Sequence, residues 1–137
     1  MKVVFDTNVW LSAVFWEGEA SKLVRKALSK KVEIIITRDI LSEIIEILNR
    51  EEKFQRFIEE RGSSVERIAR MILLSSSFVE VKSKLEIIKE HEKDNIILEA
   101  ALDGNADYIV SYDKHILNML EFRKIKILPP SDFLKIL

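Results

Sequence analysis

Short apolar runs alternate along the chain with longer stretches in which apolar residues recur every three or four positions. The runs are rich in β-branched residues, as strands are, and they lie at residues 2–5, 33–37, 78–81, 108–111 and 124–128. The stretches between them have helical periodicity, as in the stripe formed by Ile40, Leu41, Ile44, Ile45 and Leu48. Strands separated by helices run parallel, and continuous apolar runs are typical of strands buried on both faces. The pattern therefore predicts an α/β fold with three layers, in which helices cover both faces of a central five-stranded parallel sheet.

Residues 51–77 carry two further helical patterns with no strand between them. The stretch "RGSSVER" separates the two patterns, since Gly62 can end one helix and Ser63 or Ser64 can cap the next. We expect a helical hairpin inserted into the domain. Near the other end, Pro129 and Pro130 mark the start of a short helix in "SDFLKIL".

The composition is that of one compact domain spanning residues 1–137, with 47% hydrophobic and 33% charged residues. The sequence has no Cys, which excludes disulfides, thiolate catalysis and thiolate zinc sites and agrees with a reducing compartment. Asp6 interrupts the first apolar stretch, and no apolar run reaches the length of a membrane span. We expect a cytoplasmic protein with no membrane association. Abundant Lys, Glu and Ile, with a single Gln, are typical of a thermophile.

Four acidic residues lie at or near the ends of predicted strands and the starts of predicted helices, where parallel sheets bind ligands. Asp6 follows the first strand, Asp113 follows the fourth, and Asp94 and Glu43 lie near the starts of helical patterns. Each has a structural explanation: Asp94 and Asp113 as helix N-caps, Asp6 in an Asx turn, Glu43 facing water. Yet the carboxyl ends of parallel strands share one edge, where ligands bind at the reversal of strand order. Converging carboxylates repel one another unless they bind a cation, and all-oxygen ligation favours Mg²⁺ or Mn²⁺.

Several stretches together resemble the PIN domain family, specifically its prokaryotic branch of VapC-like toxin components. They are "VVFDTNVWLSAV", the helix of Glu43, "KDNIILEAALDGNADYIVSYDKHIL" and "KIKILPPSDFL". The resemblance implies a five-stranded parallel sheet and a metal-dependent ribonuclease that cleaves single-stranded or structured RNA. It also implies a small antitoxin protein as partner, and a homodimer.

Position by position, the resemblance implies that Asp6, Glu43, Asp94 and Asp113 are catalytic residues that bind Mg²⁺ or Mn²⁺, with Asn8 and Ser111 as polar support. Two positions depart from the family pattern: His115 stands where a second acid is usual, and Lys93 where many relatives carry an acid before Asp94. A second metal site is therefore left open. Glu46 is an alternative to Glu43, because one turn of helix separates them.

The chemistry implied is hydrolysis of a phosphodiester bond by a water molecule that the metal activates. Arg38 and Lys114 are positional candidates for binding the RNA backbone. For Trp10 and Trp16, packing is favoured over base stacking. Two other functions compete: an aspartyl-phosphate phosphatase of haloacid dehalogenase type, in which Asp6 would be a covalent nucleophile, and a non-catalytic α/β module that binds a partner protein. The phosphatase class prefers a second Asp where this chain has Asn8.

Overall fold

The structure is a computed structural model that describes residues 1–15, 18–84 and 92–137, with the backbone alone described at Glu92 and Lys93. Within these residues one sheet has the strand order β3-β2-β1-β4-β6-β5. The strands are β1 (Lys2–Phe5), β2 (Glu33–Ile36), β3 (Ser77–Phe78), β4 (Tyr108–Val110), β5 (Glu121–Phe122) and β6 (Ile125–Leu128). All neighbouring pairs are parallel except β5 and β6. The prediction of five parallel strands is confirmed, and a sixth, antiparallel strand is added at one edge.

Strand β5 was not predicted, because its turn lacks the usual sequence signal. The turn from β5 to β6 places Arg123 and Lys124 at positive φ, 46° and 71°. Hairpin turns with two such residues ordinarily use Asn and Gly, which reach this conformation at low cost. The pair Arg-Lys gives no sign of a turn, so residues 121–122 read as part of a loop.

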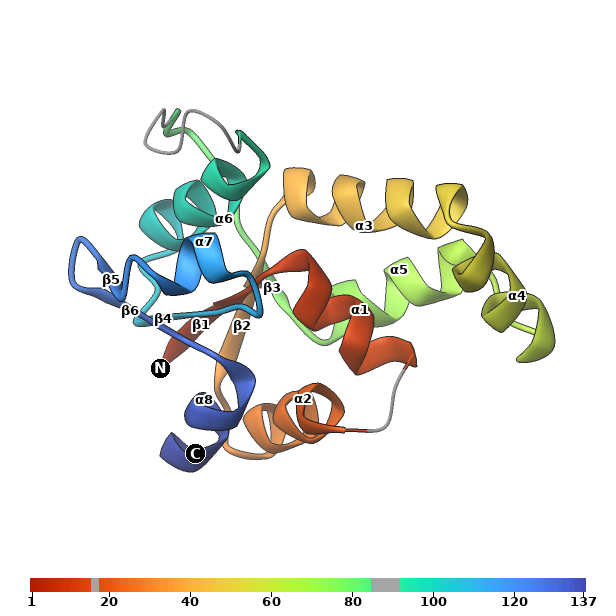
Figure 1. Ribbon diagram of the computed structural model, residues 1–137, viewed down its shortest axis with the longest axis horizontal. Helices are drawn as coiled ribbons and strands as arrows, with labels where there is room; N and C mark the ends of the chain where they lie inside the picture. The colour runs from red at the N-terminus through yellow and green to blue at the C-terminus, as the bar shows by residue number, and fades with distance from the viewer. Residues whose placement is uncertain (16–17, 85–91) are drawn as a thin grey trace.

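Helices cover both faces of the sheet, as predicted (Figure 1). The helices are α1 (Thr7–Phe15), α2 (Glu19–Ser29), α3 (Arg38–Arg50), α4 (Glu52–Glu60), α5 (Val65–Leu74), α6 (Glu92–Asp103), α7 (Lys114–Leu117) and α8 (Pro130–Ile136). Helices α2 and α8 pack together on one side of the sheet, and α6 contacts β1, β2 and β4 from the other. None of the described helices is both long enough and apolar enough to cross a membrane.

The central strands are apolar on both faces. Val3, Val4 and Phe5 of β1 are fully buried, and Ile34–Ile36 of β2 are at most 1% exposed. Trp10 is 2% exposed and meets the ring of Phe5 edge-on, with ring centroids 5.5 Å apart. Packing is therefore the correct interpretation of Trp10, whereas Trp16 lies outside the described residues. The buried strands leave β1 little freedom to shift, which fixes the position of the residue that follows it.

The predicted hairpin is present as α4 and α5, and it is joined to α1. Gly62, at φ 62°, ends α4 in a left-handed turn, and the hydroxyl of Ser64 caps α5 by accepting from the amide of Arg67 at 3.1 Å. Arg61 donates from its guanidinium to the carbonyls of Val14 and Phe15 at the end of α1. The hairpin thus supports the helix that begins next to Asp6.

Gly104 is packed too closely to accept a larger side chain without cost. A Cβ added at Gly104, just after α6, would lie 2.7 Å from Cδ1 of Ile35 and 2.8 Å from the carbonyl oxygen of Ala100. One of these atoms is backbone and the other belongs to a buried strand residue, so neither can move easily. Gly104→Ala should therefore lower the free energy of unfolding by about 1–3 kcal/mol, as overpacking does.

Urea denaturation measures this change, with Gly18→Ala as the matched control. A Cβ at Gly18 would meet nothing within 4 Å. The small loss of an N-cap preference there is offset by the reduced entropy of the unfolded chain, so the control should stay near zero. Equal effects of the two substitutions would contradict the close packing of α6 on β2.

Candidate active site

Strand order reverses between β1 and β4, where the two strands pair side by side. Phe5 of β1 lies opposite Val110 of β4, so the next residues, Asp6 and Ser111, leave the sheet together at its carboxyl edge. The amide of Asp6 donates to the carbonyl of Val110 at 2.9 Å, which extends the pairing to the acid itself. This is where an open parallel sheet binds its ligands.

The carboxylate of Asp6 is 8% exposed and accepts two hydrogen bonds. Its Oδ1 accepts from the amide of Thr7 at 2.7 Å, and its Oδ2 accepts from the hydroxyl of Ser111 at 2.7 Å. Ser111 is fully buried, and its oxygen also accepts from the amide of Asp113 at 2.9 Å. One hydroxyl therefore joins the ends of β1 and β4. Ser111, predicted to support the acids, contacts Asp6 directly.

Asp113 is half-buried and caps α7. Its Oδ1 accepts from the amide of His115 at 2.8 Å, so the N-cap interpretation of this residue is correct. Capping does not exhaust a carboxylate, which has two oxygens and about four acceptor sites. The side chain of His115 is exposed on the same short helix.

Asp94 is about 9% exposed and lies within the first turn of α6. Its alternative interpretation as an N-cap does not hold, because α6 begins two residues earlier, at Glu92. The side chain of Lys93, the other departure from the family pattern, lies outside the described residues.

The three aspartates act on one another through their charges. Burial is the main cause that raises the pKa of Asp6 from 3.8 to about 6. The hydrogen bonds from Ser111 and Thr7 lower this pKa, while the nearby charges of Asp94 and Asp113 raise it further. A site with this balance gains free energy from a bound cation, which offsets both the desolvation and the repulsion.

Glu43 and Glu46 differ in environment although they are neighbours on α3. Glu43 is half-buried beside the stripe of Ile40 and Ile44, which packs into the core. Glu46 has 62% of its side chain exposed and pairs with Arg50 at 3.2 Å. Helix α3 also contacts both α1 and α6. The rotation of the helix therefore favours Glu43 over Glu46 as a member of the site.

The remaining candidate residues lie at the surface. Asn8 is exposed in the first turn of α1, and Arg38 and Lys114 are exposed as the first residues of α3 and α7. The sequence reasoning missed two buried polar residues, Thr7 (4% exposed) and Asn95 (5% exposed), that directly follow Asp6 and Asp94. A polar residue next to an acid within an otherwise apolar pattern was the available signal for both.

The donor set fits a hard divalent cation. Among the residues that the structure describes, no three acidic or histidine side chains lie close enough to form a ready-made metal cluster. A complete cage is not required, because Mg²⁺ usually keeps several waters and binds through one or two carboxylates. Asp6, whose pKa is raised mainly by burial and further by the charges of Asp94 and Asp113, is the carboxylate that meets that need.

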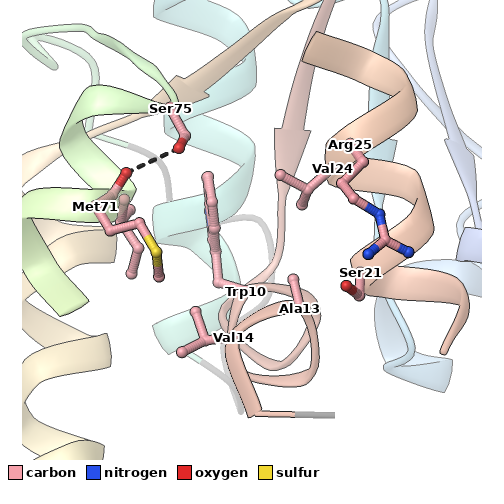
Figure 2. Close-up of a pocket in the computed structure, with 9 residues that line it drawn as sticks. Trp10, Ala13, Val14, Ser21, Val24, Arg25, Met71 and Ser75 are labelled. Carbon is pink, nitrogen blue, oxygen red and sulfur yellow. Dashed lines mark hydrogen bonds between the residues drawn. The ribbon is translucent and has the colours of Figure 1, made fainter. Parts of the chain in front are cut away.

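A separate apolar hollow of about 230 Å³ lies among α1, α2 and α5 (Figure 2). It is lined by Trp10, Ala13, Val14, Ser21, Val24, Arg25, Met71, Ile72 and Ser75. None of the four acids is among these residues. The hollow is therefore formed by residues other than the four candidate acids.

The raised pKa of Asp6 predicts how stability depends on pH. The charged form of Asp6 is disfavoured by folding, so stability decreases as pH rises from the ordinary pKa of 3.8 to about 6 and stays lower above that. Asp6→Asn removes the buried charge and keeps an acceptor for the Thr7 amide, while the hydrogen bond with Ser111 reverses, so that the new NH₂ group donates to the hydroxyl oxygen. At about pH 8 the variant should be more stable than the wild type by roughly 3 kcal/mol, from about 1.4 kcal/mol per pKa unit.

Urea unfolding in a chelating buffer measures the difference. It should nearly vanish at about pH 4, where Asp6 is neutral in the folded state. Glu46→Gln is the matched control, because the same exchange at an exposed carboxylate should change stability by less than about 1 kcal/mol at either pH. If the difference in stability between Asp6→Asn and the wild type is the same at both pH values, the interpretation of Asp6 as a buried charge is contradicted.

Comparison with known proteins identifies the family. Residues 2–115 match a family model described as PIN domain. The fold is similar to that of a chain in the crystal structure of VapBC2 from Rickettsia felis bound to a DNA fragment from their promoter, with a TM-score of 0.64 over 93% of this chain and 97% of that one. The two chains are 16% identical, so the likeness shows a common fold. No curated protein matches the sequence significantly. Because the family model spans residues 2–115, most of the chain, the protein belongs to the PIN domain family.

Proposed function

We propose that the protein is an endoribonuclease that depends on Mg²⁺ or Mn²⁺ and cleaves single-stranded or structured RNA. The observation that carries the proposal is the electrostatic coupling of Asp6, Asp94 and Asp113 at the carboxyl edge of the sheet. Membership of the PIN family supports nuclease chemistry and sets aside a phosphatase of haloacid dehalogenase type.

Each acid has a distinct part in this proposal. Asp6, held by Ser111 and Thr7, is the fixed ligand at the centre of the site. In this proposal Asp94 and Asp113, whose charges act on Asp6, are further ligands, and Glu43 of α3 is the fourth. A divalent cation held by these carboxylates lowers the pKa of water and stabilises the charge that develops on a phosphoryl group.

The exposed cations near the site serve the RNA backbone in this proposal. Arg38 begins α3 directly after β2, and Lys114 begins α7 directly after Asp113. Both side chains are exposed, as contacts to phosphates require, and such contacts place a strand without reading its sequence. Overall the chain carries a net charge of −1, so its affinity for RNA has to come from local charges of this kind.

The proposal also includes protein partners and a cellular location. The sequence resemblance to toxin components and the fold shared with a chain of VapBC2 support a small antitoxin protein as partner. A homodimer and a role in the cytoplasm belong to the proposal through the sequence resemblance alone. An antitoxin that covers the acidic site would keep the nuclease inactive. The composition typical of a thermophile is a further expectation, which a melting temperature would examine.

The nuclease activity is tested with purified protein and labelled RNA. In Mn²⁺ or Mg²⁺ the wild type should cleave, and a chelator should stop it. Asp6→Asn, Asp94→Asn and Asp113→Asn should each reduce the rate by at least about 100-fold, since even residues one step removed from a metal cost about 10- to 100-fold. Glu43→Gln should also reduce it, because the proposal makes the half-buried Glu43 a ligand of the metal.

Glu46→Gln is the matched control for Glu43→Gln, and it should cleave like the wild type because Glu46 is exposed and paired with Arg50. Circular dichroism of every variant separates lost chemistry from lost folding. A folded wild type that cleaves no RNA with either metal would overturn the nuclease proposal and favour a module that only binds a partner.

The antitoxin is tested with the protein encoded next to this one. Added at an equimolar concentration, it should suppress RNA cleavage, because a partner that covers the site excludes both metal and substrate. Size-exclusion chromatography with light scattering should show the two proteins in one complex. Cleavage that continues in the presence of a stable complex would contradict a partner that covers the acids.

A further inference from the structure

Tyr112 is an exposed aromatic residue placed between two residues of the acidic site. It follows Ser111, which holds Asp6, and precedes Asp113. The ring is 42% exposed, in contrast to the 2% of Trp10 and the full burial of Phe5. Its exposure means that core packing does not account for an aromatic side chain at this position.

The side chain of Tyr112 is directed toward α1 and α2. Ser111 and Asp113 face Asp6, and in an extended segment the residue between two such neighbours points the opposite way. Accordingly, the hydroxyl of Tyr112 lies near Ser12 of α1 and near the carboxylate of Glu19, the first residue of α2. The hydroxyl end of the ring therefore lies beside α1.

We propose that Tyr112 is a stacking platform for one base of a single-stranded RNA, next to the phosphate that is cleaved. The inference rests on the proposed nuclease function and deepens it, because it names an unpaired nucleotide as the substrate feature recognised. Aromatic rings stack on every base, so the contact favours single strands without selecting a sequence.

The charges around Tyr112 favour a base over the backbone. Glu19 lies beside the hydroxyl and repels a phosphate placed there. Lys114, exposed two residues further along, is free of that repulsion and can contact the phosphate beyond Asp113. Base and backbone are thus assigned to opposite sides of the Ser111–Asp113 segment.

Binding is tested separately from cleavage. The probe is a fluorescein-labelled single-stranded RNA, and its anisotropy is measured in Mn²⁺ with Asp6→Asn protein, which should bind without cutting. Introducing Tyr112→Leu into the Asp6→Asn protein should weaken RNA binding by roughly 5- to 100-fold, the range expected for one stacked base. Tyr112→Trp should restore it, and Tyr112→Phe should lose little, because the ring is kept.

Two controls distinguish stacking from a structural role. Phe78→Leu removes another exposed aromatic residue, 57% exposed on β3, and should change binding less than about twofold, within the range of an ordinary surface substitution. A series of RNAs with a single abasic residue should contain one position at which Tyr112→Leu has no further effect, because the base that stacks is missing.

The outcomes separate this inference from the nuclease function. If the wild type cleaves RNA but Tyr112→Leu binds as tightly as its parent, the platform is overturned and the nuclease function stands. Weaker binding by Tyr112→Leu, with no cleavage by the wild type in any metal, supports the platform and overturns the nuclease function. Loss of binding that Tyr112→Trp does not restore, and that no abasic position removes, would overturn stacking.

Discussion

The structure depends on one carboxylate that is kept out of water at the end of the central strand. Desolvation of Asp6 opposes its charge, and the neighbouring acids add to that opposition. Two short hydrogen bonds, from Ser111 and from the backbone of Thr7, offset part of the cost. A fold that placed this residue for stability alone would use a neutral side chain. The arrangement is that of a site whose unfavourable charge is relieved by a ligand.

The surrounding core makes that arrangement possible. A buried charge stays in place only if the backbone that carries it cannot move aside, and β1 is paired on both edges and covered on both faces. The hairpin of α4 and α5 adds to this restraint, because Arg61 binds the carbonyls that end α1. Stability gained in the apolar layers thus maintains a local arrangement that is unfavourable in itself.

The parallel strands and most of the candidate site residues could be predicted from the sequence, and the features that were missed have physical explanations. Apolar runs separated by stretches of helical periodicity predicted the five parallel strands. The geometry of parallel sheets then predicted that Asp6 and Asp113 lie at one edge. Ser111 was found through the resemblance, and its contact with Asp6 follows from the β1–β4 register. The choice between Glu43 and Glu46 required the rotation of α3, which the pattern does not determine. The N-cap alternative for Asp94 failed because the first residue of a helix cannot be located from sequence to within one or two positions. Tyr112 was missed because the sequence does not show whether an aromatic side chain is exposed.

The hydroxyl of Ser111 makes the geometry of the acids a property of strand pairing. The same oxygen donates to Asp6 and accepts from the amide of Asp113, so a shift between β1 and β4 would disturb both residues together. Tyr112 lies between these two contacts, and its hydroxyl lies near Ser12 of α1, the helix that starts at Thr7. Three consecutive residues after β4 therefore hold one acid, present a ring and cap a helix with a second acid. In the proposed nuclease, such a segment would position the phosphate relative to a neighbouring base through its backbone geometry, without a conformational change.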